Sequence, residues 1–432
     1  MHMNWNGKIY YDHPPMGFWL MAASYKLFGI SELSTRLPSA ILGLLSMICI
    51  YLIGKKVSKE KVVGFSAALI LGTCVWYVIR VRSGNLDSIF VFFYLLSIYT
   101  ALLARDRMVW FLVSMISFGF LMLTKTLVGA SALPVIGFIV LPELIKFRKN
   151  YLWILGGIAL LLAVVLPWYW IQYVNYPDFI QHHFFTIGTR GKTADSFLNL
   201  QYELPLFYLH MGVRKWYYLW LVAGAYLILF FRFIKKHVFS ILLWNVVILY
   251  PFLTTDQTHI WHLIPVYIPM ALIISFGIWD GGMMIIKLVK YFKIPLVKRL
   301  NLLHDRVLKG VYLGVILVIV FLQVKIFYSE VIPQYRYTPD DVDISQRVGK
   351  YDSTIYLDDD YLPLAVYYSG RFIRQMAYEP QERKILVDLF NSESKPFIVI
   401  TRNWALNNLK ESNIPYEILE QNESFSIVTK PQ

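Results

Sequence analysis

The chain has 432 residues, of which 57% are hydrophobic and only 16% charged, whereas a soluble domain is about 45–50% apolar and about 25% charged. The formal net charge is +13, but the excess lysines and arginines lie in short loops between apolar segments. In such loops they set membrane orientation, which argues against a nucleic-acid partner. The two cysteines, Cys49 and Cys74, both lie inside apolar segments, so neither a disulfide framework nor a cysteine metal site is expected.

The hydrophobic residues are gathered into long stretches. A helix that crosses a membrane needs roughly 17–25 apolar residues. Ten stretches reach or approach this length: residues 37–54, 62–80, 86–104, 109–124, 127–145, 151–174, 216–233, 238–255, 262–280 and 308–328. The sequence therefore predicts an α-helical polytopic membrane protein with about ten transmembrane helices.

Positive charge alternates between successive loops. One set of loops carries most of the lysines and arginines: residues 55–61, 105–107, 146–149, 232–236 and 287–309. The positive-inside rule places these loops in the cytoplasm, so both termini and the long outer loop 175–215 are expected on the other side. We therefore predict a multi-pass protein of the cell (plasma) membrane whose C-terminal residues are extracytoplasmic.

Two segments differ from the membrane spans. Residues 15–29 place Met16, Trp19, Leu20, Ala23 and Leu27 at helical spacing, which predicts an amphipathic helix along the outer membrane interface. From about Tyr335 the composition changes, and short strand-like runs alternate with helical ones. The expected organisation is a transmembrane domain, residues 1–330, followed by a small extracytoplasmic α/β domain, residues 335–432.

Unusual polar residues concentrate at the predicted outer face. Asp12 and His13 precede Pro14 and Pro15, and Asp12 is either a functional carboxylate or a helix cap. Asp87, in the first turn of the third span, could carry function or complement the helix dipole. Arg80 and Arg82 suit phosphate binding or headgroup anchoring, and Lys125 suits a functional role or snorkelling to the interface.

The long outer loop and the last outer loop contain the histidines. His182 and His183 are adjacent, which permits a metal site, although neighbouring side chains often diverge. Arg190, Tyr208 and His210 follow in or after the same loop. In the last outer loop, His259 and His262 are three residues apart and could share a helix face or simply form part of the interfacial aromatic belt.

The opening of the chain resembles polyprenol-phosphate-sugar-dependent glycosyltransferases of family 39, the superfamily of protein O-mannosyltransferases and lipid A aminoarabinose transferases with the GT-C fold. The resemblance rests on Asp12-His13-Pro14-Pro15, Leu27-Phe28-Gly29 and Arg36-Leu37-Pro38-Ser39-Ala40. Weaker similarities continue to about residue 280: Arg82 with Asp87, Leu123-Thr124-Lys125, Pro167-Trp168-Tyr169, Pro205 with Tyr208, and Leu263-Ile264-Pro265.

The resemblance implies a membrane glycosyltransferase that moves a hexosyl or pentosyl group, with inversion, from a dolichyl- or undecaprenyl-phosphate-type donor. The acceptor is a protein, lipid or glycan at the extracytoplasmic face. By the same resemblance Asp12 and His13 are catalytic, and Asp12 orients the acceptor or a divalent cation. A divalent cation is the one cofactor that the resemblance permits. No metal ligands are assigned. The implied donor-phosphate ligands are Arg82, Lys125, Arg190 and Tyr208, and the further candidates are Asp87, His182 and His259.

Two other interpretations remain open. A transporter or flippase of polyprenyl-linked sugars would need polar binding groups near the membrane midplane and often inverted repeats, and the sequence shows neither. Family members also begin with one further helix and an acidic motif that supplies the proposed base. This sequence begins after that point, so we expect an additional N-terminal span in the natural protein. A truncated, inactive fragment is the other alternative.

Overall fold

The computed structural model describes residues 3–6, 8–188, 199–230, 236–254, 258–291, 305–335, 338–376 and 383–431. The chain divides into two compact units. The membrane unit is Tyr11–Tyr328, and the α/β unit combines Met1–Tyr10 with Ser329–Gln432. The first ten residues thus cluster with the C-terminal part of the chain, although the sequence alone placed them in the transmembrane domain.

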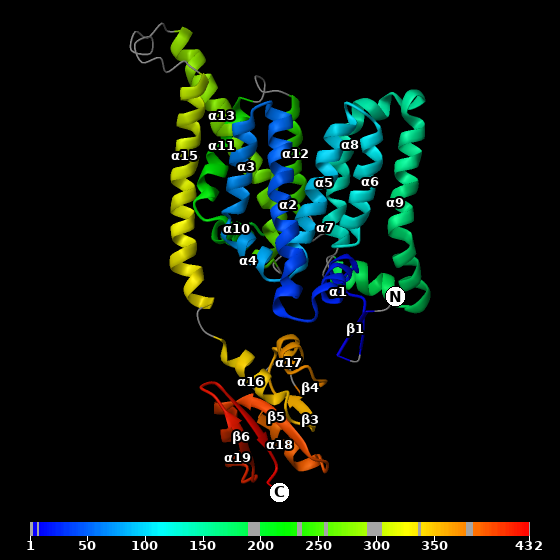
Figure 1. Ribbon diagram of the computed structural model, residues 1–432, viewed down its shortest axis with the longest axis vertical. Helices are drawn as coiled ribbons and strands as arrows, with labels where there is room; N and C mark the ends of the chain where they lie inside the picture. Colours follow the sequence, from blue (N-terminus) through cyan, green and yellow to red (C-terminus); the bar gives the residue numbers. More distant parts are fainter. Residues whose placement is uncertain are drawn as a thin grey trace. The chain divides into compact units, whose positions relative to one another are not determined.

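Apolar helices dominate the membrane unit (Figure 1). Among the described residues, six stretches are long and apolar enough to cross a membrane: Glu32–Ser58, Leu86–Ala104, Thr126–Ile145, Arg148–Asn175, Ile260–Leu288 and Arg306–Gln334. A bent pair adds a seventh candidate span, and the shorter apolar helices are Val109–Met122, Trp216–Leu229 and Val238–Thr254. Within the described residues, each of the ten predicted segments coincides mainly with apolar helix, which confirms a helical polytopic membrane fold.

The described elements of this unit are all helices. In chain order they are α1 (Met16–Phe28), α2 (Glu32–Ser58), α3 (Lys61–Gly72), α4 (Val75–Arg82), α5 (Leu86–Ala104), α6 (Val109–Met122), α7 (Thr126–Ala130), α8 (Ala132–Ile145), α9 (Phe147–Asn175), the π-helix η1 (Gln181–Gly188), α10 (Glu203–Val213), α11 (Trp216–Leu229), α12 (Lys236–Leu249), η4 (Tyr250–Thr254), η5 (Ile260–Val266), α13 (Tyr267–Tyr291) and α15 (Asp305–Ile326).

Helices α5 and α13 form the centre of the bundle. In the most apolar stretch of α5, 72% of the residues are buried, whereas in that of α15 only 17% are. Helix α15 therefore leaves most of its surface for lipid. Close packing near the centre depends on small residues, as in other membrane bundles. At Gly64 of α3 a Cβ atom would lie 2.3 Å from the Tyr51 carbonyl oxygen of α2, so a larger residue there would force these helices apart.

The second predicted span is broken at Thr73 and Cys74, where α3 and α4 meet at a 70° bend. A break inside a membrane frees backbone groups that need new partners. Gln323 of α15 donates to the Thr73 carbonyl at 3.2 Å, and the Trp216 indole donates to the Thr73 hydroxyl at 3.0 Å. The bend therefore costs few unpaired groups, and it places α4, which carries Arg80 and Arg82, at one end of the bundle.

The predicted helix at residues 15–29 is present as α1. Its N-cap is Pro15, with no side-chain capping bond, so the capping alternative for Asp12 does not hold. The amide of Met16 instead donates to the Leu123 carbonyl at 2.9 Å, which fixes the start of α1 against the turn that leads to Lys125. The interfacial position of α1 stays a prediction.

The α/β unit is built on a five-stranded sheet with the order β4-β3-β5-β7-β6. Strand β3 pairs in parallel with β4 and β5, and β7 pairs antiparallel with β5 and β6. The strands are β3 (Thr354–Leu357), β4 (Ile373–Gln375), β5 (Phe397–Arg402), β6 (Glu417–Gln421) and β7 (Phe425–Thr429). The helices are α16 (Asp340–Val348), α17 (Leu362–Ser369), α18 (Arg383–Ser392) and α19 (Leu406–Glu411).

Both faces of this sheet are covered. Ile344 and Ala365, from α16 and α17, belong to one hydrophobic cluster, and Phe390 and Leu409, from α18 and α19, belong to the other. Strand β5 contributes to both clusters and is buried along most of its length. This arrangement confirms the small C-terminal α/β structure expected from the sequence.

A short N-terminal hairpin belongs to the same unit. Strands β1 (Met3–Trp5) and β2 (Lys8–Tyr10) pair antiparallel around Asn6, whose φ is 46°. The side-chain Nδ2 of Asn6 donates to the backbone carbonyl of Ile373 at 2.6 Å, and the backbone N–H of Ile373 donates to Oδ1 of Asn6 at 3.3 Å. The hairpin is thus bonded to edge strand β4, and from Tyr10 the chain continues directly to Tyr11 and Asp12.

Candidate functional site

The Asp12 carboxylate and the His182 ring form the most direct pairing of two sequence-predicted residues. His182 Nε2 lies 2.6 Å from Asp12 Oδ1, and the two side chains are 30% and 39% exposed. Tyr11 supports the pair: its ring meets the His182 ring edge-on at 5.1 Å, and its hydroxyl donates to Asp178 at 2.8 Å. The carboxylate is therefore held in place but remains open to a substrate.

His183 points the other way and anchors the loop. Its Nδ1 lies 3.2 Å from the Tyr11 carbonyl oxygen, and its Nε2 lies 2.8 Å from the Thr126 hydroxyl of α7. The ring stacks on Phe179 with centroids 5.0 Å apart. Burial lowers the pKa of His183 below its ordinary value, which favours the neutral ring in this packed position. Adjacent His182 and His183 therefore diverge.

A second group of predicted residues surrounds Asp87 at the start of α5. Asp87 is 2% exposed, and its carboxylate accepts hydrogen bonds from Arg80 Nε at 2.6 Å and from the Lys125 ammonium. Asn85 caps α5 by accepting from the Asp87 amide at 2.9 Å. Because two cations share one carboxylate, the group keeps a net positive charge, and both cationic side chains remain partly exposed.

His13 connects the two groups electrostatically. Burial lowers the pKa of His13, the Lys125 ammonium lowers it further, and the carboxylates of Asp12 and Asp87 act in the opposite direction. These interactions place His13 within electrostatic range of both Asp12 and the Asp87 group. Helices α1, α4 and α7 lie at one end of the bundle (Figure 1), so the structure assembles the candidate site there.

Three further predicted residues lie within the described part of the chain, and a fourth does not. Arg82 ends α4 and is half-buried, and Tyr208 of α10 packs against the main hydrophobic core. His259 stacks on Trp261 with centroids 4.7 Å apart, and the Trp261 ring in turn receives the Arg80 guanidinium at 5.3 Å. Arg190 lies outside the described residues. In this structure Arg80, rather than Arg82, pairs with Asp87.

The sequence analysis missed Tyr11 and Asp178, which brace the Asp12–His182 pair. Tyr11 directly precedes the acidic motif, and its ring also stacks on Tyr176 with centroids 4.9 Å apart. Its place directly before the Asp-His-Pro-Pro motif is the local signal that could have identified Tyr11. Asp178 carries no motif of its own, because its partner lies 167 positions earlier in the chain.

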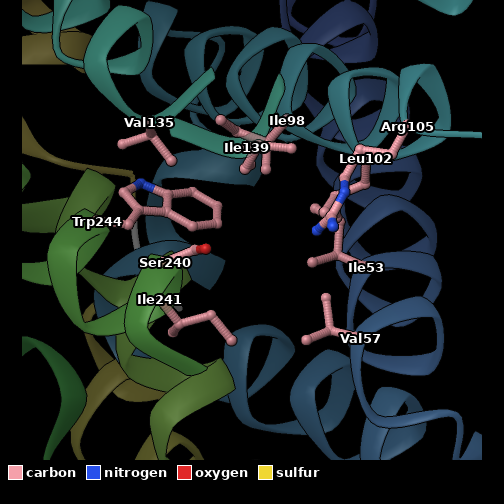
Figure 2. A pocket seen from close by; sticks show the side chains of 10 residues that line it. All are labelled: Ile53, Val57, Ile98, Leu102, Arg105, Val135, Ile139, Ser240, Ile241 and Trp244. Carbon is pink, nitrogen blue, oxygen red and sulfur yellow. The ribbon is translucent and has the colours of Figure 1, made fainter. Parts of the chain in front are cut away.

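The enclosed pocket of the membrane unit lies elsewhere. Side chains of α2, α5, α8 and α12 surround it, and Arg105, Ser240 and Trp244 are its polar members (Figure 2). Its volume is about 20 Å³, enough for about one water molecule but not for a sugar or a lipid chain. None of the predicted site residues lines this pocket, so it is a packing void rather than part of the site.

A metal centre is not evident among the described residues, which contain no group of three or more His, Cys, Asp or Glu side chains that could hold an ion. Asp12 and His182 together offer two ligands, whereas a catalytic zinc site has three protein ligands.

Part of the chain is similar to known proteins. Residues 12–170 match the family model described as dolichyl-phosphate-mannose-protein mannosyltransferase. The undecaprenyl phosphate-alpha-4-amino-4-deoxy-L-arabinose arabinosyl transferase of Pseudomonas savastanoi pv. phaseolicola is 28% identical over 211 residues, which cover 46% of this chain and 39% of that protein. The corresponding protein of Pectobacterium atrosepticum is 27% identical over 289 residues, covering 63% and 50%.

The fold agrees as well. The crystal structure of ArnT from Cupriavidus metallidurans bound to undecaprenyl phosphate matches with a TM-score of 0.65 and 16% identity, covering 100% of this chain and 91% of that chain. The matched regions span about a third to a half of the length of the curated relatives. Over part of its length the chain therefore resembles the dolichyl-phosphate-mannose-protein mannosyltransferase family and the aminoarabinose transferases, and it has the fold of ArnT.

Proposed function

We propose that the protein transfers a sugar from a polyprenyl-phosphate donor to an acceptor at the extracytoplasmic face of the membrane. The observation that carries this proposal is the pairing of Asp12 with His182. The cationic Asp87 group is linked to it, because His183, next to His182, lies 2.8 Å from the hydroxyl of Thr126, which follows Lys125. Such a site offers a carboxylate for an acceptor hydroxyl and positive charge for a phosphate. The family match over residues 12–170 supports the same reaction class.

In the proposed reaction, the Asp12–His182 pair acts on the acceptor, and the cations around Asp87 act on the donor phosphate. Asp12 takes the proton of the acceptor hydroxyl as its oxygen attacks the anomeric carbon, a general-base contribution worth about 10²–10⁴-fold. His182 orients the carboxylate. The bond from the anomeric carbon to the phosphate oxygen breaks, and its electron pair leaves with the polyprenyl phosphate. Arg80 and Lys125 stabilise the charge that develops on that phosphate. A single displacement of this kind inverts the anomeric centre.

The proposal is tested with full-length protein in detergent and a polyprenyl-phosphate sugar labelled in the sugar. We expect one polyprenyl phosphate released per sugar transferred, with an inverted anomeric configuration in the product. Asp12→Asn keeps the shape of the side chain but not its basicity, and should lower kcat by about 10²-fold or more. Asp106→Asn is the matched control. Asp106 lies on the connection after α5, where it pairs with Lys56 of α2 instead of with a residue of the proposed site.

Transfer at the wild-type rate by Asp12→Asn would reduce Asp12 to a structural residue. In reconstituted vesicles, movement of the sugar lipid across the membrane without any transfer would instead favour a flippase. The orientation is tested separately by a reporter fused after Gln432. An exported reporter supports the extracytoplasmic placement of the α/β unit, and an active cytoplasmic reporter contradicts it.

A further inference from the structure

An open groove runs along the amino ends of the three parallel strands β4, β3 and β5. Its volume is about 550 Å³, and its lining comes from the residues that begin each of these strands. The carboxyl ends of parallel strands are the usual ligand site in open α/β sheets. Here polar groups at those ends are paired with one another: Thr401 donates to Asp358 at 2.7 Å, and Arg402 donates to Asp359 at 2.5 Å.

The groove carries surplus positive charge. Arg371, Arg374 and Lys395 line it, and its lining contains one carboxylate, Asp352. Arg371 bonds that carboxylate at 3.3 Å and the Gly349 carbonyl at 3.1 Å. Among the described residues, neither Arg374 nor Lys395 forms an ion pair with a carboxylate. Glu393, which accepts from the Tyr356 hydroxyl at 3.2 Å, interacts electrostatically with Lys395, so the three cations of the groove face two carboxylates and the surplus charge is positive.

Their geometry suits a phosphate. Arg374 donates from one terminal nitrogen to the Tyr356 hydroxyl at 3.2 Å, with its guanidinium 5.8 Å from the centre of that ring. This contact fixes the direction of the guanidinium and leaves other donors for a ligand. A guanidinium with free donors matches phosphate oxygens in a forked geometry.

In the sequence, an aromatic residue, Phe372, lies between Arg371 and Arg374. Phe372 lines the groove and is 58% exposed, an unusual position for a large apolar ring on a polar rim. Aromatic rings flanked by cations are favoured where a protein meets the headgroup region of a bilayer. Phe372 therefore distinguishes this groove from a binding site for small soluble anions, where an exposed ring adds little.

The chain keeps this unit near a bilayer. Residues 327–339 separate the end of α15 from the start of α16, and a connection of that length spans at most about 50 Å when extended. The unit is also joined covalently at Tyr10–Tyr11. Tethering raises the effective concentration of headgroups at the groove, so even weak individual contacts can hold it in place.

We propose that this groove binds the phosphate of anionic phospholipid headgroups, with Phe372 in the interfacial region, so that the α/β unit docks on the membrane surface. Arg374 and Lys395 supply the donors, and Arg371 exchanges part of its contact with Asp352 for the lipid. The same strand, β4, is bonded by Asn6 of the hairpin that leads to Asp12. Docking would thus steady the segment from which the proposed catalytic carboxylate extends.

The test uses full-length protein in lipid nanodiscs. Cys49 and Cys74 are buried, so Ser394→Cys, exposed beside Lys395, gives a selective site for a fluorophore. A nitroxide on the lipid headgroup reports docking by quenching. We expect much stronger quenching in discs with about one third phosphatidylglycerol than in phosphatidylcholine alone. The difference should shrink at high salt, because the Debye length falls to about 3 Å at 1 M.

Charge reversals locate the effect. Lys395→Glu and Arg374→Glu should each reduce the docked population about fivefold or more, as expected for loss of one basic contact with an anionic surface. Lys410→Glu, at an exposed position of α19, is the matched control and should leave quenching unchanged. Thermal unfolding of each variant verifies folding, and Lys395→Glu is the safer variant because its ammonium makes no described side-chain bond.

Three results would overturn the proposal. One is equal quenching in the two lipid compositions with a folded wild-type protein. Another is anionic-lipid quenching that is unaffected by Lys395→Glu and Arg374→Glu. The third is a fluorophore response to millimolar inorganic phosphate, dependent on Lys395, without any response to phosphatidylglycerol. That last result would assign the groove to a soluble anion instead.

Discussion

Two carboxylates at the same end of the membrane unit have opposite environments. The Asp12 side chain is 39% exposed and bonds one side chain, His182. Asp87 is almost completely buried and bonds both Arg80 and Lys125. A carboxylate that is partly exposed can contact a substrate, whereas a buried carboxylate whose two oxygens are both hydrogen-bonded holds its partners in place. This difference is the basis for proposing that Asp12 takes part in the chemistry and that Asp87 holds the cations in place.

The sharpest test of this division is Asp87→Asn. Removing the charge leaves Arg80 and Lys125 without their shared partner, and breaking a buried ion pair costs about 3–5 kcal/mol. We expect a large fall in the unfolding free energy, measured by thermal unfolding in detergent. Asp106→Asn, which removes one partner of a more exposed pair with Lys56, should cost at most about 1 kcal/mol. Equal, small effects of the two changes would remove the structural role from Asp87.

A smaller effect is expected from Lys125→Gln. Asp87 keeps Arg80, but the site loses one donor to the proposed donor phosphate. A hydrogen bond to a charged group contributes about 1.5–3 kcal/mol, so KM for the sugar donor should rise by roughly 10–100-fold. Lys56→Gln, which removes the partner of Asp106, is the control. An unchanged KM in a folded Lys125→Gln protein would show that Lys125 serves Asp87 alone.

The sequence predicted the helical architecture because a membrane span is a local pattern. It could not predict the contacts between the groups of the site. Asp12 and His182 are 170 positions apart, and no periodicity relates them. The bend at Thr73 was also missed, because it is held by distant helices: Gln323 donates to the Thr73 carbonyl and Trp216 donates to the Thr73 hydroxyl. In the α/β unit, β4 has only three residues, too few for a strand pattern to be recognised.

The smallest predicted effect concerns His183. Its pKa is lowered by burial in the folded protein, so below the ordinary value of about 6.5 the unfolded chain binds a proton that the folded ring resists. Stability should therefore fall as the pH drops through about 6.5 and level off below the folded pKa. His183→Gln should reduce this pH dependence while leaving stability at pH 8 within about 1–2 kcal/mol of wild type. An identical pH profile in the variant would exclude His183 as its source.

The central claim is that Asp12 and His182 act as one catalytic unit, and a double-mutant cycle on kcat tests it most directly. Asp12→Asn should lower kcat by about 10²-fold or more, and His182→Gln by less, because His182 only orients the carboxylate. The double variant should be no slower than Asp12→Asn alone, since His182 has nothing left to orient. Multiplied losses in the double variant, with all three proteins folded, would show that the two residues act independently and would contradict the account.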